Sequence, residues 1–186
     1  MTEGTLSVRD SSDADVNDIT QIYGHWVEHG LASFEIVPPS PATMAQRRLS
    51  ILADGFPYLA AVDSVGRLLG FGYASWYRTR PAYRFACEDS VYVSPLALRR
   101  SVGRRLLDEL VCRCTAMEFR LMVAVIGGSG NAPSIELHRR AGFEMAGLLP
   151  SIGWKHDRWV DTVFMARPLG AGNQSPPVER GRPMPS

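Results

Sequence analysis

The 186-residue sequence has few cysteines, no long apolar run and almost no excess charge. Its three cysteines are too few for a disulfide framework, which favours a reducing, cytoplasmic setting. No window approaches the ~18 consecutive apolar residues of a membrane span, and residues 1–10 lack the order of a signal peptide. The 20 basic and 19 acidic side chains leave a net charge of +1. This balance argues against a nucleic-acid-binding protein.

Hydrophobic periodicity predicts one mixed domain, residues 1–169, followed by a tail. We expect helices over 16–29, through Met44 to Leu52, over 102–117 and from 131 to 141, and strands over 6–9, 58–63, 68–76, 85–93, 121–126, 143–149 and 159–167. Three strands in series precede the alternation of helix and strand, which predicts a mixed sheet with helices on its faces. The Pro/Gly-rich tail, 170–186, is expected to be disordered or draped over the surface.

The segment between the strand at 85–93 and the helix at 102–117 is rich in arginine. Helix N-termini attract phosphate through unpaired N–H groups, and Gly103 lets a ligand approach the backbone closely. These residues by themselves support two interpretations equally: a pyrophosphate cradle, or a helix with a solvated basic face.

Five motifs in register resemble the GNAT superfamily of N-acetyltransferases, and in particular its phosphinothricin N-acetyltransferase branch. The motifs are Arg80-Pro-Ala-Tyr83, Glu88-x-x-Val-Tyr-Val93, Val123-Ala-Val-Ile-Gly127, Asn131-x-x-Ser134-x-x-Leu-His138-x-x-Ala-Gly-Phe143 and Gly153-Trp-Lys-His-x-x-Trp159-x-Asp161. The resemblance implies a mixed, mostly antiparallel central sheet with helices on both faces. It also implies acetyl-CoA as co-substrate and no metal.

The acyl-CoA-binding motif of that superfamily usually reads Gln/Arg-x-x-Gly-x-Gly/Ala. Aligned through Gly103, this chain has Leu98 at the first position and Ser101 at the first glycine. Because the motif binds through backbone amides, Ser101 is tolerated if its φ is negative. The resemblance implies a coenzyme site formed by Val91, Tyr92, Val93, Arg99, Arg100, Ser101, Val102, Gly103, Arg104, Asn131 and Ser134. Asn131 also suits a helix N-cap.

Acetylation of an amine needs a base, because an amine with a pKa of roughly 8 or above is mostly protonated at neutral pH. Glu88 lies in a strand among apolar neighbours, where burial would raise the pKa of its carboxyl. The residues alone favour a structural pair with Arg80 or Arg84, whereas the resemblance implies that Glu88 is the base. His138, where many relatives have a tyrosine, is given a secondary catalytic role. The three cysteines, Cys87, Cys112 and Cys114, are interpreted as small core residues.

The resemblance implies an acceptor site formed by Phe34, Arg78, Arg80, Tyr83, Lys155 and Trp159. Arginine binds carboxylates and phosphinates bidentately, so Arg80 suits an amino-acid-like acceptor. Lys155 is interpreted equally well as a charged surface residue or as a residue that binds the acceptor. The expected acceptors are phosphinothricin, methionine sulfoximine and methionine sulfone, acetylated by direct transfer in a ternary complex.

Two other functions stay open: acetylation of another amine or a peptide terminus, and a non-catalytic acyl-CoA-binding module, for which Leu98 and Ser101 leave room. The resemblance further implies a homodimer. His25 and His29 lie at i, i+4 but lack the glutamate of a zinc-protease motif, so no metal site is expected.

Overall fold

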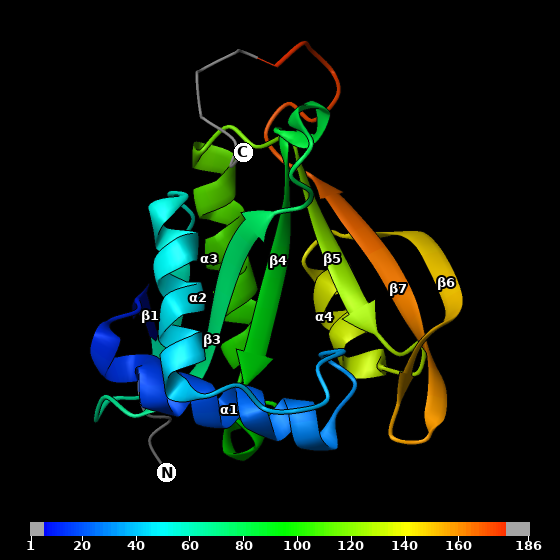
Figure 1. Cartoon of the computed structure of the whole chain (residues 1–186). Coiled ribbons are helices and arrows are strands. Elements are labelled where there is room, and N and C mark those ends of the chain that lie inside the picture. Colours follow the sequence, from blue (N-terminus) through cyan, green and yellow to red (C-terminus); the bar gives the residue numbers. More distant parts are fainter. Residues whose placement is uncertain (1–5, 178–186) are drawn as a thin grey trace.

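The computed structural model describes residues 6–177 as a sheet flanked by helices (Figure 1). Its elements are β1 (Ser7–Asp10), α1 (Val16–His29), α2 (Pro41–Ala53), β2 (Tyr58–Val62), β3 (Leu68–Trp76), β4 (Ala86–Val93), α3 (Val102–Ala116), β5 (Leu121–Gly127), α4 (Ala132–Arg140), β6 (Glu144–Lys155) and β7 (Arg158–Pro168). Short 3-10 turns at Asp13–Asp15, Pro81–Tyr83 and Pro95–Ala97 were not predicted.

The strands form one sheet in the order β1-β2-β3-β4-β5-β7-β6. Every neighbouring pair is antiparallel except β4 and β5, which are parallel. The predicted mixed, mostly antiparallel sheet is therefore confirmed.

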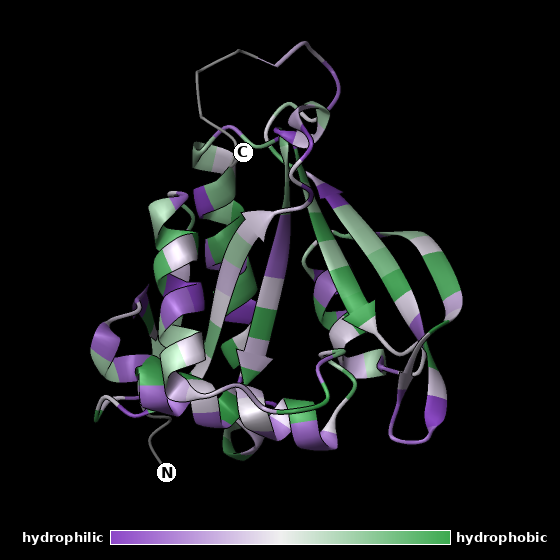
Figure 2. Ribbon diagram, viewed as in Figure 1, coloured by the Kyte–Doolittle hydropathy of each residue, from purple (hydrophilic) through white to green (hydrophobic). Residues whose placement is uncertain are grey.

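Helices cover both faces of this sheet, as predicted, and each face has its own apolar core. On one face, the apolar stripe of α3 packs against β3 and β4, with Leu106, Leu107 and Leu110 fully buried. On the other face, α1 and α2 cover β2 and β3 through a second cluster that includes Tyr58 and Phe71. Figure 2 shows hydrophobic residues concentrated on β5 and β7. The residues of the candidate site described below are divided between these two faces.

The parallel pair β4 and β5 separates part of the way along its length. Pairing runs from Ala86 opposite Leu121 to Asp89 opposite Ala124 and stops there, and Figure 1 shows the two strands diverging towards α1. Backbone groups beyond Asp89 that point towards β5 therefore have no strand partner, and the sheet contains a V-shaped opening.

Two expectations, on the end of β6 and on the burial of Cys112, need correction. β6 extends to Lys155, well past the predicted end at 149, because two irregularities in its register with β7 let the hairpin continue. In the tail, which was expected to be disordered or draped over the surface, the Gly172 and Pro176 carbonyls accept hydrogen bonds from the Arg120 guanidinium; residues 178–186 lie outside the described part. Cys87 and Cys114 are buried core residues, but Cys112 is exposed on α3.

Among the helices of the described residues, none combines the length and apolar character required to cross a membrane.

Candidate active site

The N-terminus of α3 presents free backbone N–H groups to a cavity, an arrangement called the cradle below. The first backbone bond into the helix runs from the Arg105 N–H to the Ser101 carbonyl at 3.0 Å, so the preceding N–H groups lack helical partners. The Ser101 side chain makes no cap hydrogen bond. A cavity of about 560 Å³ lies in front of these groups, bordered by Leu98, Arg99, Ser101–Arg104 and, from α4, Pro133, Glu136, Leu137 and Arg140. Free N–H groups and the positive end of the helix dipole suit a pyrophosphate.

The backbone of Ser101 does not meet the condition of a negative φ. Its φ is +59° and that of Arg99 is +60°, both in the left-handed region that favours glycine. Ser101 therefore adopts a backbone conformation that suits the glycine of the usual superfamily motif, at a cost of roughly 1 kcal/mol. Leu98 is half-exposed and contributes no polar group to the cavity.

The predicted arginines do not all point to this cavity. Arg99 and Arg104 border it. The Arg104 Nε bonds the Asp108 carboxylate at 2.6 Å and its Nη1 bonds the Arg140 carbonyl at 2.9 Å, so this side chain ties α3 to α4. Arg100 does not border the cavity, because it faces the β2–β3 turn. The pKa of Asp63 in that turn is lowered mainly by backbone hydrogen bonds and to a smaller extent by the charge of Arg100.

The V between β4 and β5 continues this cradle into the sheet as a narrow cleft. The Ser94 N–H bonds the Leu69 carbonyl of the β3 side, so by alternation the backbone groups of Val91 and Val93 point into the V. The indole of Trp26 in α1 already bonds the Val93 carbonyl at 2.8 Å. This contact was not predicted, and it leaves Val91 and the Val93 N–H to bind a ligand.

Helix α4 forms one wall of the cleft. Asn131 caps it, with its Oδ1 accepting from the Ser134 N–H at 3.4 Å, so the N-cap interpretation is confirmed. Both side chains also border the cleft, together with Asp89 and residues of β4 and β5. A capping role and a ligand-binding role are therefore compatible for Asn131.

His138 projects from α4 to β4 and is held at both ring nitrogens. Nδ1 lies 2.8 Å from the Ser134 carbonyl and Nε2 lies 3.0 Å from the Asp89 carboxylate. The carbonyl can only accept, so Nδ1 carries a proton, and the carboxylate favours a second proton on Nε2. Burial, the largest single effect, opposes the charged ring, but the hydrogen bond and charge of Asp89 and the bond to the Ser134 carbonyl together outweigh it and raise the pKa of His138. The other Asp89 oxygen, Oδ1, is buried without a hydrogen-bond partner.

Glu88 lies on the opposite face of β4 from Asp89. Its carboxyl is half-buried and makes no hydrogen bond or ion pair within residues 6–177, so the predicted pairs with Arg80 or Arg84 are not formed. Burial and, next, the charge of Asp89 raise its pKa to about 7, against the opposing charge of Arg78. A carboxyl with a pKa near neutrality and no partner is suited to accept a proton.

Arg78, a predicted acceptor residue just after the end of β3, lies near two tyrosines, of which only Tyr83 was predicted for the site. Its guanidinium lies 5.3 Å from the Tyr77 ring centre and 5.9 Å from that of Tyr83, and its charge reaches Glu88. The Arg80 side chain is exposed and has no ion pair among the described residues. The aromatic contacts position the Arg78 guanidinium, and the Arg80 guanidinium is available to an anionic group.

Lys155 and Phe34 connect the β6–β7 hairpin to the loop after α1. Lys155 is 3% exposed, and its Nζ donates to the Ser33 carbonyl at 2.6 Å. A Cβ at Gly153 would lie 2.0 Å from the Phe34 ring, so that ring packs directly on the hairpin backbone. The hydrogen bond to the Ser33 carbonyl accounts for the buried position of the Lys155 side chain. Trp159 is 63% exposed, packs edge-on against Trp154 and borders a separate cavity beside the loop after β5.

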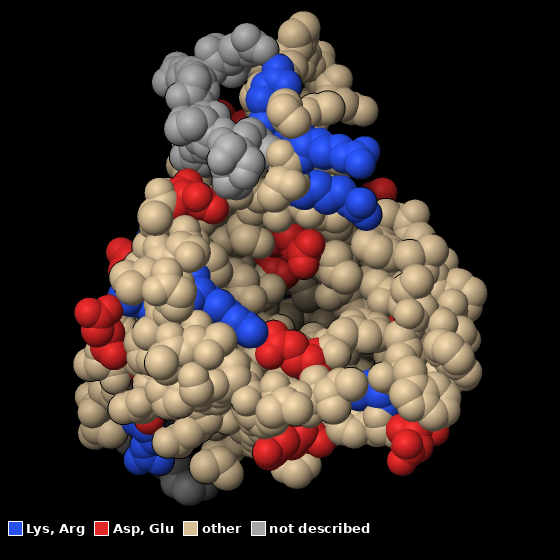
Figure 3. All heavy atoms as spheres, in the orientation of Figure 1, with Lys and Arg blue, Asp and Glu red and all other residues tan. Residues whose placement is uncertain are grey.

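A polar network that the sequence did not predict joins α1, this loop and α2. The Tyr23 hydroxyl contacts Ser33 Oγ and donates to Glu35, and Glu35 also accepts from Arg47 at 2.6 Å. Figure 3 shows a hollow in this face of the molecule, with acidic side chains inside it and at its edge and basic side chains around its rim. Mixed charge of this kind suits a ligand that carries both signs.

Comparisons with known proteins agree with this geometry. Residues 22–143 match the model of the acetyltransferase (GNAT) family. A phosphinothricin N-acetyltransferase of Alcaligenes faecalis is 48% identical over 92% of this chain and 86% of its own length. An L-methionine sulfoximine/L-methionine sulfone acetyltransferase of Pseudomonas aeruginosa is 37% identical over 92% of this chain and 99% of its own. A GNAT superfamily phosphinothricin acetyltransferase from Sinorhizobium meliloti, solved with AcCoA, superposes with a TM-score of 0.91 at 50% identity, covering 94% of each chain.

The chain belongs to the GNAT acetyltransferase family. It is an acetyl-CoA-dependent N-acetyltransferase.

Proposed function

We propose that this enzyme transfers the acetyl group of acetyl-CoA to the α-amino group of a small amino-acid-like acceptor: phosphinothricin, methionine sulfoximine or methionine sulfone. The observation that carries the proposal is Glu88, half-buried without a partner, with a pKa of about 7 and close enough to Arg78 to feel its charge. Acidic groups suit the ammonium of such an acceptor, and arginines suit its carboxylate and its phosphinate or sulfone oxygens. The names of the relatives support the same class.

In this proposal, residues on different sides of β4 bind the coenzyme and take the proton from the acceptor. Bound acetyl-CoA supplies an acetyl thioester. Val91 and the free N–H groups of α3 are suited to hold the coenzyme in the V and in the cradle. From the other face, Glu88 takes the proton of the ammonium and leaves a neutral amine. Positioning two substrates in one site supplies much of the rate, which fits direct transfer.

His138 keeps the secondary catalytic role in this proposal. Its imidazolium can donate to the departing thiolate, but both ring nitrogens already make hydrogen bonds. The proton on Nε2 becomes available to sulfur only when the bond to Asp89 opens.

The test is thiol release from acetyl-CoA with each of the three acceptors, comparing wild type with Glu88→Gln. Glutamine keeps the shape but cannot accept the proton, so we expect kcat to fall at least a hundredfold. Glu144→Gln, an exposed carboxyl on β6, is the matched control. Coenzyme binding without turnover of any acceptor would contradict the proposal and favour a binding module.

We also propose a homodimer formed through the β6 edge. This edge strand and the start of β7 expose large apolar side chains: Met145, Leu148, Leu149, Ile152, Trp154 and Trp159. An exposed edge strand with an apolar surface is suited to association. Sedimentation of wild type should show a dimer, and Leu149→Asp should give a monomer. Val65→Asp, the same change at an exposed turn residue, should leave the dimer intact.

The proposed setting is the cytoplasm, where Cys87, Cys112 and Cys114 stay as free thiols, as in the structure. Acetylation of phosphinothricin there would give resistance to that herbicide.

A further inference from the structure

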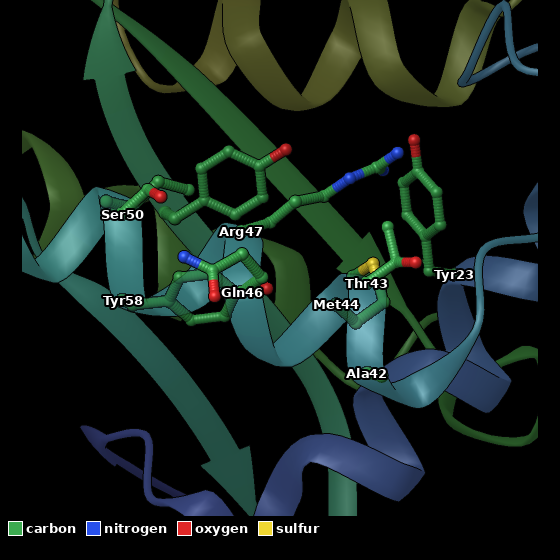
Figure 4. A pocket seen from close by; sticks show the side chains of 10 residues that line it. Tyr23, Ala42, Thr43, Met44, Gln46, Arg47, Ser50 and Tyr58 are labelled. Atoms are coloured by element: carbon green, nitrogen blue, oxygen red, sulfur yellow. The ribbon is translucent and has the colours of Figure 1, made fainter.

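A cavity of about 680 Å³ lies between α1, α2 and the sheet, and no residue predicted for the site borders it. Its border consists of Tyr23, Ala42, Thr43, Met44, Gln46, Arg47, Ser50, Ile51, Tyr58 and Tyr73. Figure 4 shows the side chains of α2 along one side and Arg47 extending towards Tyr23. Three tyrosines and several aliphatic groups make the border mostly apolar. A cavity of this size takes drug-sized groups and exceeds the side chain of methionine sulfone.

This cavity lies on the same face of the sheet as Glu88. Tyr73 pairs with Ser90, and Ser75 pairs with Glu88 across β3 and β4. Since side chains alternate along a strand, Tyr73 and Glu88 point to one face, about 7 Å apart along the strand direction. The charge of Glu88 contributes to raising the pKa of Tyr73, after burial, to about 12, against a hydrogen bond to Ser90. The side chain of an acceptor whose amino group lies at Glu88 can therefore reach this cavity.

The border of the cavity carries an unused hydrogen-bonding group. Tyr58 is 1% exposed, and its hydroxyl is buried without a hydrogen-bond partner. Its ring stacks on that of Tyr73, with the centres 5.0 Å apart. Elsewhere on the border, the Arg47 guanidinium lies 5.9 Å from the centre of the Tyr23 ring. Aromatic faces and a buried hydroxyl suit a flat ring with a polar group at its far end.

We propose that this cavity is an acceptor side-chain pocket that extends the substrates to amino acids with an aromatic side chain, and that Tyr58 binds a polar group on the ring. The inference rests on the proposed function, because it places the acceptor amino group at Glu88. It makes tyrosine a better acceptor than phenylalanine, since only tyrosine offers a partner to the Tyr58 hydroxyl.

The first experiment compares kcat/KM for methionine sulfone, phenylalanine and tyrosine in wild type and Tyr58→Phe. Wild type should acetylate all three and prefer tyrosine to phenylalanine. The substitution removes one hydroxyl, so the preference should fall about fivefold, the effect of one neutral hydrogen bond. Methionine sulfone, whose side chain is shorter than that of tyrosine, should be unaffected.

The second experiment fills the pocket with Ser50→Trp. Ser50 is exposed on α2, so the larger side chain can be accommodated without unfolding the core. The KM for tyrosine should rise about tenfold, with methionine sulfone unchanged. Calorimetric binding of tyrosine to the complex with coenzyme A, which cannot react, should weaken by the same factor. Leu49→Trp, at an exposed neighbouring residue outside the border, is the matched control.

The outcomes separate the two proposals. No turnover of methionine sulfone, phosphinothricin or methionine sulfoximine by wild type would overturn the proposed function. Turnover of methionine sulfone with neither phenylalanine nor tyrosine accepted would overturn the pocket alone. Aromatic turnover that is insensitive to Ser50→Trp would also overturn it, by placing the ring elsewhere.

Discussion

His138 Nε2 lies 3.0 Å from the Asp89 carboxylate, and this buried contact joins α4 to β4 where β4 and β5 begin to separate. The side chains are 6% and 1% exposed, respectively. The pair borders the cleft between β4 and β5. It also affects the electrostatic surroundings of Glu88, because the charge of Asp89 helps to raise the pKa of Glu88, second to burial.

Asp89→Asn should destabilise the fold by about 3 kcal/mol, because it leaves a buried imidazole without its counterion. The pKa of His138 is raised in the folded state, so its contribution is fully present below the unfolded pKa of ~6.5 and is lost as pH rises through the folded value. Urea unfolding should therefore show a larger loss at pH 5.5 than at pH 9. Equal losses at the two pH values would contradict an ion pair, and Asp54→Asn, at an exposed carboxyl, should cost little at either.

Glu88→Gln should stabilise the protein above neutral pH. The folded pKa of Glu88 is raised from 4.5 to about 7, so the folded state holds this proton more tightly than the unfolded chain. Stability is therefore lost as pH rises from 4.5 to 7, by roughly 3 kcal/mol at most. Glutamine removes that loss. The difference in unfolding free energy between variant and wild type should grow from pH 4.5 to pH 8, and a constant difference would show that the carboxyl titrates normally.

Ser101→Gly should raise stability by up to about 1 kcal/mol, since glycine adopts φ +59° without strain and no cap hydrogen bond is lost. Thermal unfolding measures the gain. Calorimetry should show coenzyme A binding at least as tightly, because the backbone N–H groups keep their positions. Ser101→Ala, which keeps a Cβ, should gain nothing, and a glycine variant less stable than wild type would refute the strain.

Arg80→Ala should raise the acceptor KM about tenfold with little change in the KM for acetyl-CoA. The Arg80 side chain is exposed near Arg78 and has no ion pair in the part of the chain that is described, so its removal should not disturb the fold. Steady-state kinetics with methionine sulfone test this. An unchanged acceptor KM would remove Arg80 from the site, and Arg67→Ala in the β2–β3 turn controls for the loss of a surface charge.

Local patterns in the sequence determined most of the elements and several members of the site. The apolar stripe of α3 and the buried run of β5 have the periods of a helix and a doubly covered strand, so both were predicted nearly to the residue. Glu88 was predicted as a partly buried carboxyl because its strand neighbours are apolar. Asn131 was predicted as a helix cap from its place before Pro133.

Only the tertiary structure decided which of these residues meet. Asp89 and His138 are 49 positions apart, and Lys155 and Ser33 are 122. The left-handed backbone of Ser101 and the cavity beside Tyr58 likewise depend on how neighbouring elements pack. A periodic pattern states which face of an element is buried, but the partner on that face depends on strand order and on where β4 and β5 separate. Those features arise from the packing of the whole chain, and a single sequence carries no local signal for them.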